Sequence, residues 1–96
     1  MNDGKPAMTI SDVPERSRYE ARIDGTDQVA IAAYTNRGSE RVFTHTEVPE
    51  SLEGRGVGGA LVKYALEDTR KQGLTIVPDC PFVASYIRKH PEIANT

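Results

Sequence analysis

Four glycines in six residues constrain this chain more than any other feature of its sequence. They lie in residues 53–60, which read EGRGVGGA, between a segment with strand-like alternation and one with helical periodicity. Glycine costs roughly 1 kcal/mol relative to alanine inside a helix, so a cluster at a helix start is expensive. The unpaired N–H groups at a helix N-terminus carry partial positive charge, and glycine lets an anion approach them closely. The turn therefore predicts a phosphate-binding site, with a tight turn and close helix packing as the competing interpretation.

Three segments before the turn have the pattern of β-strands. Apolar and polar residues alternate over residues 18–24 and 40–48, while residues 28–35 are apolar on both faces. Asp24-Gly25 and residues 36–39 have the composition of turns and separate these segments. The first half of the chain therefore predicts an antiparallel meander of three strands.

The residues after the turn predict a helix, a short strand and a second helix. From Arg55 onward apolar residues recur with helical spacing, and Gly73 follows the last of them, where it suits a left-handed helix end. Residues 74–77 are a short apolar run, and residues 82–90 have helical character up to Pro91. The expected fold is α+β, with the meander followed by a helix, a strand and a short C-terminal helix.

Residues 1–17 differ in composition from the rest of the chain. They mix Asn, Asp, Gly, Pro and Ser with few apolar residues, which indicates a mobile N-terminal arm. A chain of 96 residues is short for more than one domain, so we expect residues 18–96 to form a single domain.

Charge and composition exclude several classes of partner. The formal net charge is −2, with Lys and Arg scattered, which argues against nucleic acid. No apolar run reaches the roughly 20 residues of a membrane span, and the N-terminus lacks the apolar core of a signal peptide. Cys80 is the only cysteine, so it has no disulfide partner in the chain and no companions for a zinc site, and we expect no metal. A cytoplasmic location is the simplest expectation.

The spacing of the glycines leaves the phosphate ligand open. A P-loop requires Lys followed by Ser or Thr after its last glycine, and none is present. Gly54, Gly56 and Gly59 do match the dinucleotide fingerprint, and Asp79 follows about twenty residues later. Residues 49–54 are a long connection for that motif, however, and the chain after Asp79 is too short to complete a doubly wound sheet.

The flanking segments resemble those of the GNAT superfamily of N-acetyltransferases. The coenzyme A loop of that superfamily reads Gln/Arg-Gly-x-Gly-x-Gly/Ala, and residues 53–58 match it with Glu53 in place of Gln or Arg. The chain is most similar to small stand-alone GNAT-like proteins of about a hundred residues. Those combine a His-Thr-x-Val strand, the glycine turn and a Cys-Pro segment. In this chain the strand motif is His45-Thr46-Glu47-Val48, before the turn, and the Cys-Pro segment is Cys80-Pro81, after it. The resemblance spans residues 19–91.

The resemblance implies a GNAT-like fold with two splayed strands and acetyl-CoA, or free CoA, between them. The splayed segments would be residues 43–48 and 76–80, with the pantetheine arm in the gap and the pyrophosphate on the amides of the turn. The implied reaction is transfer of an acetyl group from acetyl-CoA to an amine. The residues expected to bind the coenzyme are Thr46, Val48, Gly54, Arg55, Gly56, Val57, Gly58, Gly59 and Ala60.

Four side chains are candidates for the chemistry. Cys80 precedes a helix start, where a thiolate is stabilised, so it is a candidate nucleophile, a site-lining residue or an inert core thiol. His45 and Glu47 share a strand face at spacing two and are a candidate base and its orienting carboxylate, or a structural histidine and a solvated acid. The resemblance makes Tyr86 a candidate acid for the CoA thiolate, although the usual superfamily motif around such a tyrosine is not present.

Two other classes of function remain open beside the acetyltransferase. One is a module that binds CoA or acetyl-CoA without efficient catalysis, and the other is a small interaction domain. The sequence leaves open whether the acceptor amine belongs to a protein or a small molecule, and it indicates a monomer or weak dimer, because a strand near Tyr19 is a candidate edge.

Overall fold

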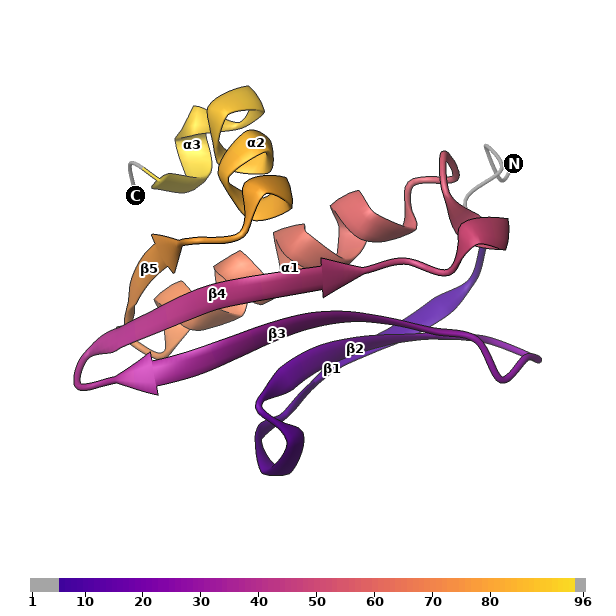
Figure 1. Cartoon of the computed structure of the whole chain (residues 1–96), viewed down its shortest axis with the longest axis horizontal. Coiled ribbons are helices and arrows are strands. Elements are labelled where there is room, and N and C mark those ends of the chain that lie inside the picture. The colour runs from indigo at the N-terminus through magenta and orange to yellow at the C-terminus, as the bar shows by residue number, and fades with distance from the viewer. Residues whose placement is uncertain (1–5, 95–96) are drawn as a thin grey trace.

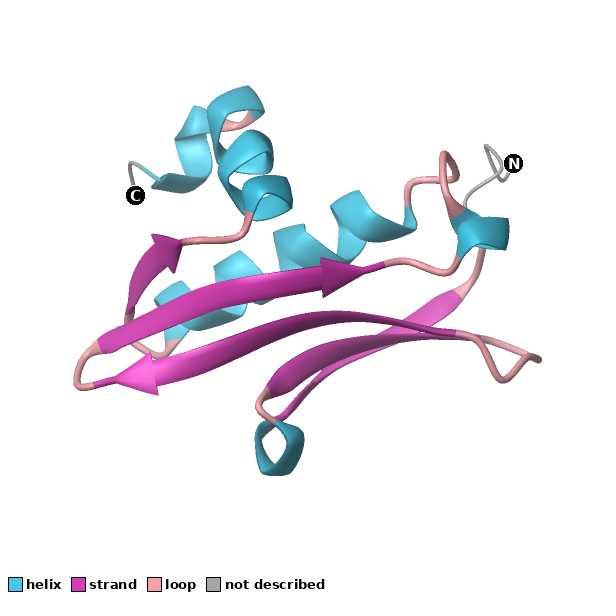
Figure 2. Cartoon of the chain, viewed as in Figure 1, coloured by secondary structure: helices cyan, strands magenta, loops and turns pink. Residues whose placement is uncertain are grey.

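The computed structural model describes residues 6–94, which form a five-stranded sheet with its helices packed on one face (Figures 1 and 2). The strands occur in the sheet in chain order, and neighbours are antiparallel except for the last pair, which is parallel. The strands are β1 (Met8–Val13), β2 (Arg18–Ile23), β3 (Val29–Arg37), β4 (Glu40–Glu47) and β5 (Thr75–Pro78).

Two of the three α-helices in the described residues were expected from the sequence, whereas the last, which begins at Pro91, was not. The α-helices are α1 (Val57–Lys71), α2 (Pro81–Lys89) and α3 (Pro91–Ala94), with single 3-10 turns at Pro14–Arg16 and Glu50–Leu52 (Figure 2). The predicted α+β fold is confirmed, including the meander, the long helix, the strand after it and the C-terminal helix. Gly73 has the expected left-handed conformation, with φ of 76°.

The N-terminal segment corrects one expectation. Residues 8–13 of the expected mobile arm form strand β1, which pairs antiparallel with β2 along its whole length. Met8 and Ile10 point inward and pack against the core, while Thr9 and Ser11 are exposed. The alternation is easily missed because the apolar residues Met8, Ile10 and Val13 do not keep a strict period of two and the partner strand supplies most of the order. Residues 1–5 of the expected arm lie outside the described residues.

The core lies between one face of the sheet and α1, and we call this side the inner face. Tyr19, Tyr34 and Phe43 from three strands pack with ring centroids 5.5–6.2 Å apart. The apolar stripe of α1 covers them, and its fully buried apolar members include Leu61, Val62 and Leu66. Figure 1 shows α1 behind β4 with α2 and α3 beyond the end of β5, and in the described residues no α-helix covers the opposite, outer face of β2–β4.

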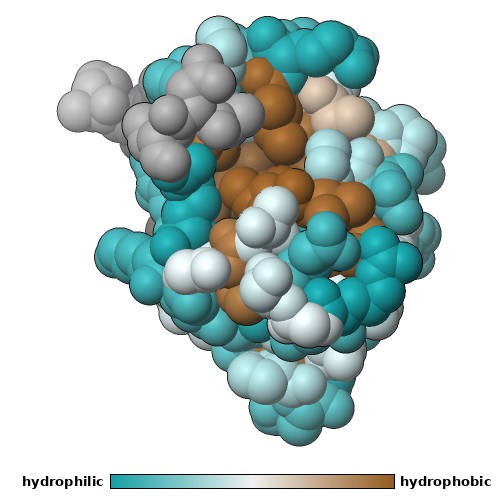
Figure 3. Space-filling model, turned by 90° about the vertical axis from the view of Figure 1, so that its left-hand side faces the viewer, coloured by the Kyte–Doolittle hydropathy of each residue, from teal (hydrophilic) through white to brown (hydrophobic). Residues whose placement is uncertain are grey.

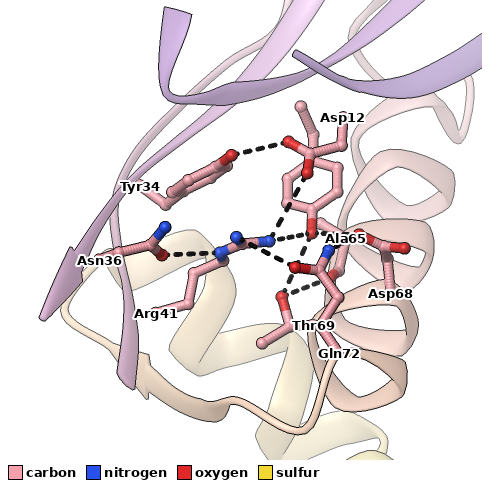
Figure 4. A network of polar contacts seen from close by, with 9 residues as sticks. Asp12, Tyr34, Asn36, Arg41, Ala65, Asp68, Thr69 and Gln72 are labelled. Atoms are coloured by element: carbon pink, nitrogen blue, oxygen red, sulfur yellow. Dashed lines mark hydrogen bonds and ion pairs between the residues drawn. The ribbon is translucent and has the colours of Figure 1, made fainter. Parts of the chain in front are cut away.

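A buried polar network occupies the end of the core near the C-terminus of α1 (Figure 4). Arg41 donates to the Tyr19 hydroxyl at 2.7 Å, lies 3.8 Å from the Asp12 carboxylate and stacks on the Tyr34 ring. Burial and the hydrogen bond to Asp12 raise the pKa of Tyr34 to about 12. The network joins all four antiparallel strands to α1; its other members are Asn36, Asp68, Thr69 and Gln72.

Strands β4 and β5 separate partway along. They pair only from Glu40–Thr75 to Phe43–Pro78, after which the Cys80 N–H donates to the Phe43 carbonyl and the chain turns into α2. The remaining residues of β4 therefore lose β5 as a neighbour. Figure 3 views the end of the molecule that carries β5, where an apolar area is bordered by polar side chains. None of the helices within residues 6–94 combines the length and apolar character needed to cross a bilayer.

Candidate active site

A cavity of about 370 Å³ opens where β4, the glycine turn and the N-terminal ends of α1 and α2 meet. We call it the glycine-turn cavity. Its size is within the range of small-molecule sites. It brings together seven of the nine residues expected to bind a coenzyme and three others. The lining residues are Thr46, Val48, Leu52, Glu53, Gly54, Gly56, Val57, Gly58, Gly59 and Phe82.

The turn owes its shape to glycine at two positions. Gly54 and Gly56 have φ of 80° and 84°, a left-handed conformation that residues with a side chain rarely adopt. Gly56 is the N-cap of α1, and Leu52 anchors the preceding 3-10 turn in the core. The left-handed residues turn the chain sharply from the end of β4 into α1, so the helix N-terminus faces the cavity.

Backbone hydrogen bonds decide which amides remain available for a ligand. The Arg55 N–H donates to the Leu52 carbonyl at 3.2 Å, and the Ala60 N–H donates to the Gly56 carbonyl at 3.1 Å. The amides of residues 56–59 precede the first helical hydrogen bond and have no acceptor within the helix. The amides available to a ligand are therefore those of residues 56–59, a subset of the expected residues 55–60, and the structure does not place Arg55 or Ala60 in the cavity wall.

Gly58 leaves space that any other residue would fill. A Cβ atom built there would lie 2.7 Å from the Phe82 ring and 3.2 Å from Val48 Cγ2. Gly58 is buried where α1 packs closely against Phe82 of α2 and against Val48, the residue after β4. This close approach provides some support for the packing interpretation, but the same glycine also lines the cavity with its N–H group unpaired within α1.

A β-bulge in β4 determines which side chains face the cavity. Tyr34 pairs with Phe43 and Ala33 with His45, so Thr44 is an extra residue without a partner in β3. Strict alternation would place Phe43 and His45 on the same face. The extra residue shifts the alternation, so Thr46 joins Phe43 on the inner face and lines the cavity.

The same bulge sends His45 and Glu47 to the outer face of the sheet. Their side chains are both more than half exposed, and His45 Nε2 lies 2.5 Å from Glu47 Oε2. The expectation that they share a face is confirmed, whereas their expected place beside the cavity is not what the structure shows. They lie on the opposite face of the same four-residue segment as Thr46, where β4 has separated from β5.

Cys80 lies directly behind the cavity wall. Its Sγ is 3.3 Å from Thr46 Oγ1, and its side chain is buried in the core cluster. Cys80 is also the N-cap of α2, with Pro81 as the first helical residue. The thiol thus joins the inner face of β4 to the start of α2, next to the cavity but with little exposed surface.

Tyr86 lies near the glycine turn, one helical turn beyond Phe82 on α2. Its ring is within 3.9 Å of where a Cβ of Gly59 would lie and stacks on His90, with ring centroids 4.2 Å apart. Burial raises the pKa of Tyr86, so its phenol holds its proton at neutral pH.

Three lining residues were not among those expected to bind the coenzyme. Glu53 belongs to the loop motif, whereas Leu52 and Phe82 stand in segments without a periodic pattern or next to a proline, so only the tertiary contacts reveal these two. The cavity wall combines apolar side chains with unpaired N–H groups, which suits the phosphates and apolar arm of a coenzyme. Within residues 6–94 no group of three His, Cys, Asp or Glu side chains is placed to hold a metal ion.

Comparisons with known proteins agree with this geometry. The chain is 26% identical over 90 residues to Protein NATD1 of Xenopus tropicalis, an alignment that covers 93% of this chain and 83% of that protein. It is 30% identical to Protein NATD1 of Mus musculus over 78 residues, covering 80% and 71%, and 30% identical to that of Homo sapiens over 77 residues, covering 79% and 68%.

One family model matches most of the chain. It is described as GCN5-related N-acetyl-transferase, and it matches residues 18–96. That range begins at β2 and includes the bulged strand, the glycine turn and the Cys-Pro junction. The chain therefore belongs to the GCN5-related N-acetyltransferase family.

Proposed function

We propose that this protein is an N-acetyltransferase that takes an acetyl group from acetyl-CoA and transfers it to an amine. The observation that carries the proposal is the set of four amides, residues 56–59, that are unpaired within α1 and open on a cavity beside the separation of β4 and β5. The positive end of α1 attracts a pyrophosphate at this point. The family, whose general donor is acetyl-CoA, adds to this support.

The inner face of β4 suits the apolar arm of the donor. Thr46 on β4 and Val48 just after it line the cavity, and Phe82 closes it from α2. Beyond Phe43 the described structure shows no strand on the β5 side of β4, so peptide groups at that edge are available to a bound arm. We assign the stabilisation of the thioester oxyanion to a backbone N–H of this edge.

The transfer requires an amine in its neutral form. Its nitrogen attacks the thioester carbon, a C–N bond forms, the C–S bond breaks, and the sulfur leaves as a thiolate that takes up a proton. We assign the removal of the amine proton to His45, which faces outward beside the gap between β4 and β5, so the amine approaches the thioester through that gap from the outer face. Its Nε2 faces Glu47, so in the neutral tautomer Nε2 donates to the carboxylate and Nδ1 accepts a proton, while Glu47 stabilises the imidazolium that results.

We propose direct transfer rather than an acetyl-cysteine intermediate. The Cys80 side chain is 4% exposed and its Sγ faces Thr46, which favours a role in the wall of the site over attack on a thioester. Tyr86 has a proton to donate, but its position beside Gly59 puts it near the phosphate-binding amides. The proton taken up by the thiolate then comes from the imidazolium or from water.

Thermal unfolding in the presence of CoA or acetyl-CoA tests the proposal. A ligand at a hundred times its dissociation constant stabilises a protein by about 2.7 kcal/mol. We expect both ligands to raise the unfolding temperature, and we expect acetyl-CoA to be consumed when an amine acceptor is present. Stabilisation without consumption over a broad amine panel would favour a CoA-binding module, and no stabilisation by either ligand would rule out both functions.

A further inference from the structure

The outer face of the sheet carries a cluster of arginines around a buried carboxylate. Glu20 is 1% exposed although no α-helix of the described residues covers this face. Arg18 Nε donates to Glu20 Oε2 at 2.8 Å, Arg16 to the same oxygen at 3.2 Å, and Arg22 to Oε1 at 2.9 Å. We call these four residues the arginine cluster.

The cluster presents more positive charge than Glu20 requires. Three guanidinium groups against one carboxylate leave a net charge of +2 on a chain whose net charge is −2. Burial raises the pKa of Glu20, but the hydrogen bonds from Arg18 and Arg16 and the nearby charges outweigh it, so the carboxylate stays ionised and continues to orient the arginines.

Stability alone does not account for three arginines. The side chains of Arg16 and Arg22 are 55% and 58% exposed, and ion pairs with so much solvent around them contribute little to folding. A guanidinium has five N–H donors, and the hydrogen bonds to Glu20 use one from each arginine. Because Glu20 holds the guanidinium groups in place, their remaining exposed N–H donors are suited to bind further anionic groups.

The cluster lies on the same face as the His45–Glu47 pair. In the strand pairing, Arg18 faces Ala33, which faces His45, and Glu20 faces Ile31, which faces Glu47. Arg18 and His45 are thus two strands apart, or about 10 Å. Between them lie a small residue and a half-buried apolar one, so nothing bulky separates the two groups.

We propose that the arginine cluster binds acidic residues of a protein substrate. The acceptor amine at His45 belongs to a residue about three positions away in the same segment of that substrate. This rests on the proposed function, whose acceptor it specifies. Three residues of extended chain span about 10 Å, which matches the separation of the two groups. The exposed face of a sheet suits an extended polypeptide better than a small molecule, because a small amine would have no enclosing walls. Glu40 and Glu47 on the same face disfavour nucleic acid.

Peptide binding tests the inference in the full chain saturated with CoA. The probes are fluorescent peptides with one central lysine, flanked three residues away by glutamates, by lysines or by serines, and a DNA duplex of similar length. Arg16→Gln/Arg22→Gln removes two positive charges and leaves Arg18 on Glu20, so the fold is retained. Lys71→Gln/Lys89→Gln makes the same change in net charge on α1 and α2, away from this face. Thermal unfolding with CoA is measured for each variant.

We expect the glutamate-flanked peptide to bind best, and its affinity to fall about tenfold in Arg16→Gln/Arg22→Gln with little change in the lysine control. CoA should stabilise all of these proteins equally. Equal affinity for acidic and basic peptides, tighter binding of DNA, or the same loss in both double variants would overturn the inference while CoA stabilisation stands. If CoA does not raise the unfolding temperature of the wild-type protein, the proposed function is overturned instead.

Discussion

At the residue scale, the hydrogen atom that Gly58 carries in place of a side chain keeps the glycine-turn cavity open. The Phe82 ring and the Val48 methyl group already approach the space where a Cβ would lie. Because Phe82 is 42% exposed, its ring can move aside on α2, and the 3.2 Å approach to Val48 Cγ2 requires only a small shift of that side chain. A larger residue at this position would therefore fill the cavity without necessarily unfolding the chain.

We expect Gly58→Val to abolish stabilisation by CoA, because the branched side chain covers the amides at the start of α1. Thermal unfolding with and without CoA measures the effect. Gly38→Val is the matched control, since Gly38 lies in the β3–β4 turn with φ of 55°. Strain there lowers the unfolding temperature but should leave the increment due to CoA intact. A Gly58→Val protein with the wild-type CoA increment would place the phosphates elsewhere.

His45 is the residue on which the proposed chemistry depends most. We expect His45→Gln to slow acetyl transfer by about a hundredfold or more, the usual contribution of a general base, while CoA binding is unchanged. The rate of acetyl-CoA consumption with an amine measures this. Glu40→Gln is a control on the same face, where Glu40 pairs with exposed Arg37 and should not affect the rate. An unchanged rate in His45→Gln would remove His45 from the mechanism.

At the element scale, β4 matters more than any other strand because its two halves have different neighbours. Its first half pairs with β5, and its second half faces the cavity on one side and solvent on the other. The bulge at Thr44 marks the change, since it shifts the alternation of side chains by one residue. Thr46 and His45 consequently lie on opposite faces of β4, Thr46 toward the cavity and His45 toward solvent.

The junction between β4 and α2 leads to a prediction about Cys80. If the thiol only lines the site, Cys80→Ser should keep acetyl transfer within about tenfold, because serine is also a good N-cap and is similar in size. Mass spectrometry of the wild-type protein after incubation with acetyl-CoA should show no acetyl group on Cys80. An adduct that disappears in Cys80→Ala would establish the covalent route instead.

At the scale of the whole molecule, the network around Arg41 joins the strands to α1. Arg41 is 4% exposed and lies among Asp12, Tyr19 and Tyr34, at the end of α1 opposite the glycine turn. A buried charge of this kind is costly unless all its partners are present. In the described residues every buried side-chain nitrogen or oxygen atom has a hydrogen-bond partner, so the network is complete.

We expect Arg41→Ala to lower the free energy of unfolding by about 3–5 kcal/mol, because it removes the positive charge beside the Asp12 carboxylate and a hydrogen-bond donor to the Tyr19 hydroxyl. Urea denaturation of both proteins measures the difference. Lys71→Ala, an exposed change on α1, should cost less than about 0.5 kcal/mol. A loss in Arg41→Ala no larger than in Lys71→Ala would show that the network is not needed for the fold.

The same network predicts how stability depends on pH. Burial raises the pKa of Tyr34 to about 12, above the value near 10 that it has in the unfolded chain. The unfolded state therefore loses the proton first, and the stability contributed by the protonated phenol, present below pH of about 10, is lost as pH rises toward about 12. We expect urea denaturation at several pH values to show this decline, and Tyr34→Phe to reduce its slope. An unchanged slope would assign the decline to the other tyrosines whose pKa burial raises, Tyr19 and Tyr86.

The extent to which sequence predicts this fold follows from the range of the interactions. The apolar stripe of α1, the alternation in β2 and the left-handed Gly73 arise from neighbours a few residues apart, and each is as the sequence predicted. Strand β1 was missed because it is stabilised by pairing with β2 and by inward contacts of Met8 and Ile10, not by its own composition. Among the cavity residues, the glycine turn was predictable and Phe82 was not.

By itself, the sequence determined the order of the elements from β2 to α2, the turn that directs the N-terminus of α1 toward the glycine-turn cavity, and the family to which the chain belongs. Only the tertiary structure decided that β1 is a strand, that His45 and Glu47 face outward, and that the amides of residues 56–59 remain unpaired within α1. Local backbone preferences act within one segment and can be read along the chain. Pairing register, a bulge and a shared cavity depend on segments that meet only after folding, so they follow from the packing of the whole sheet.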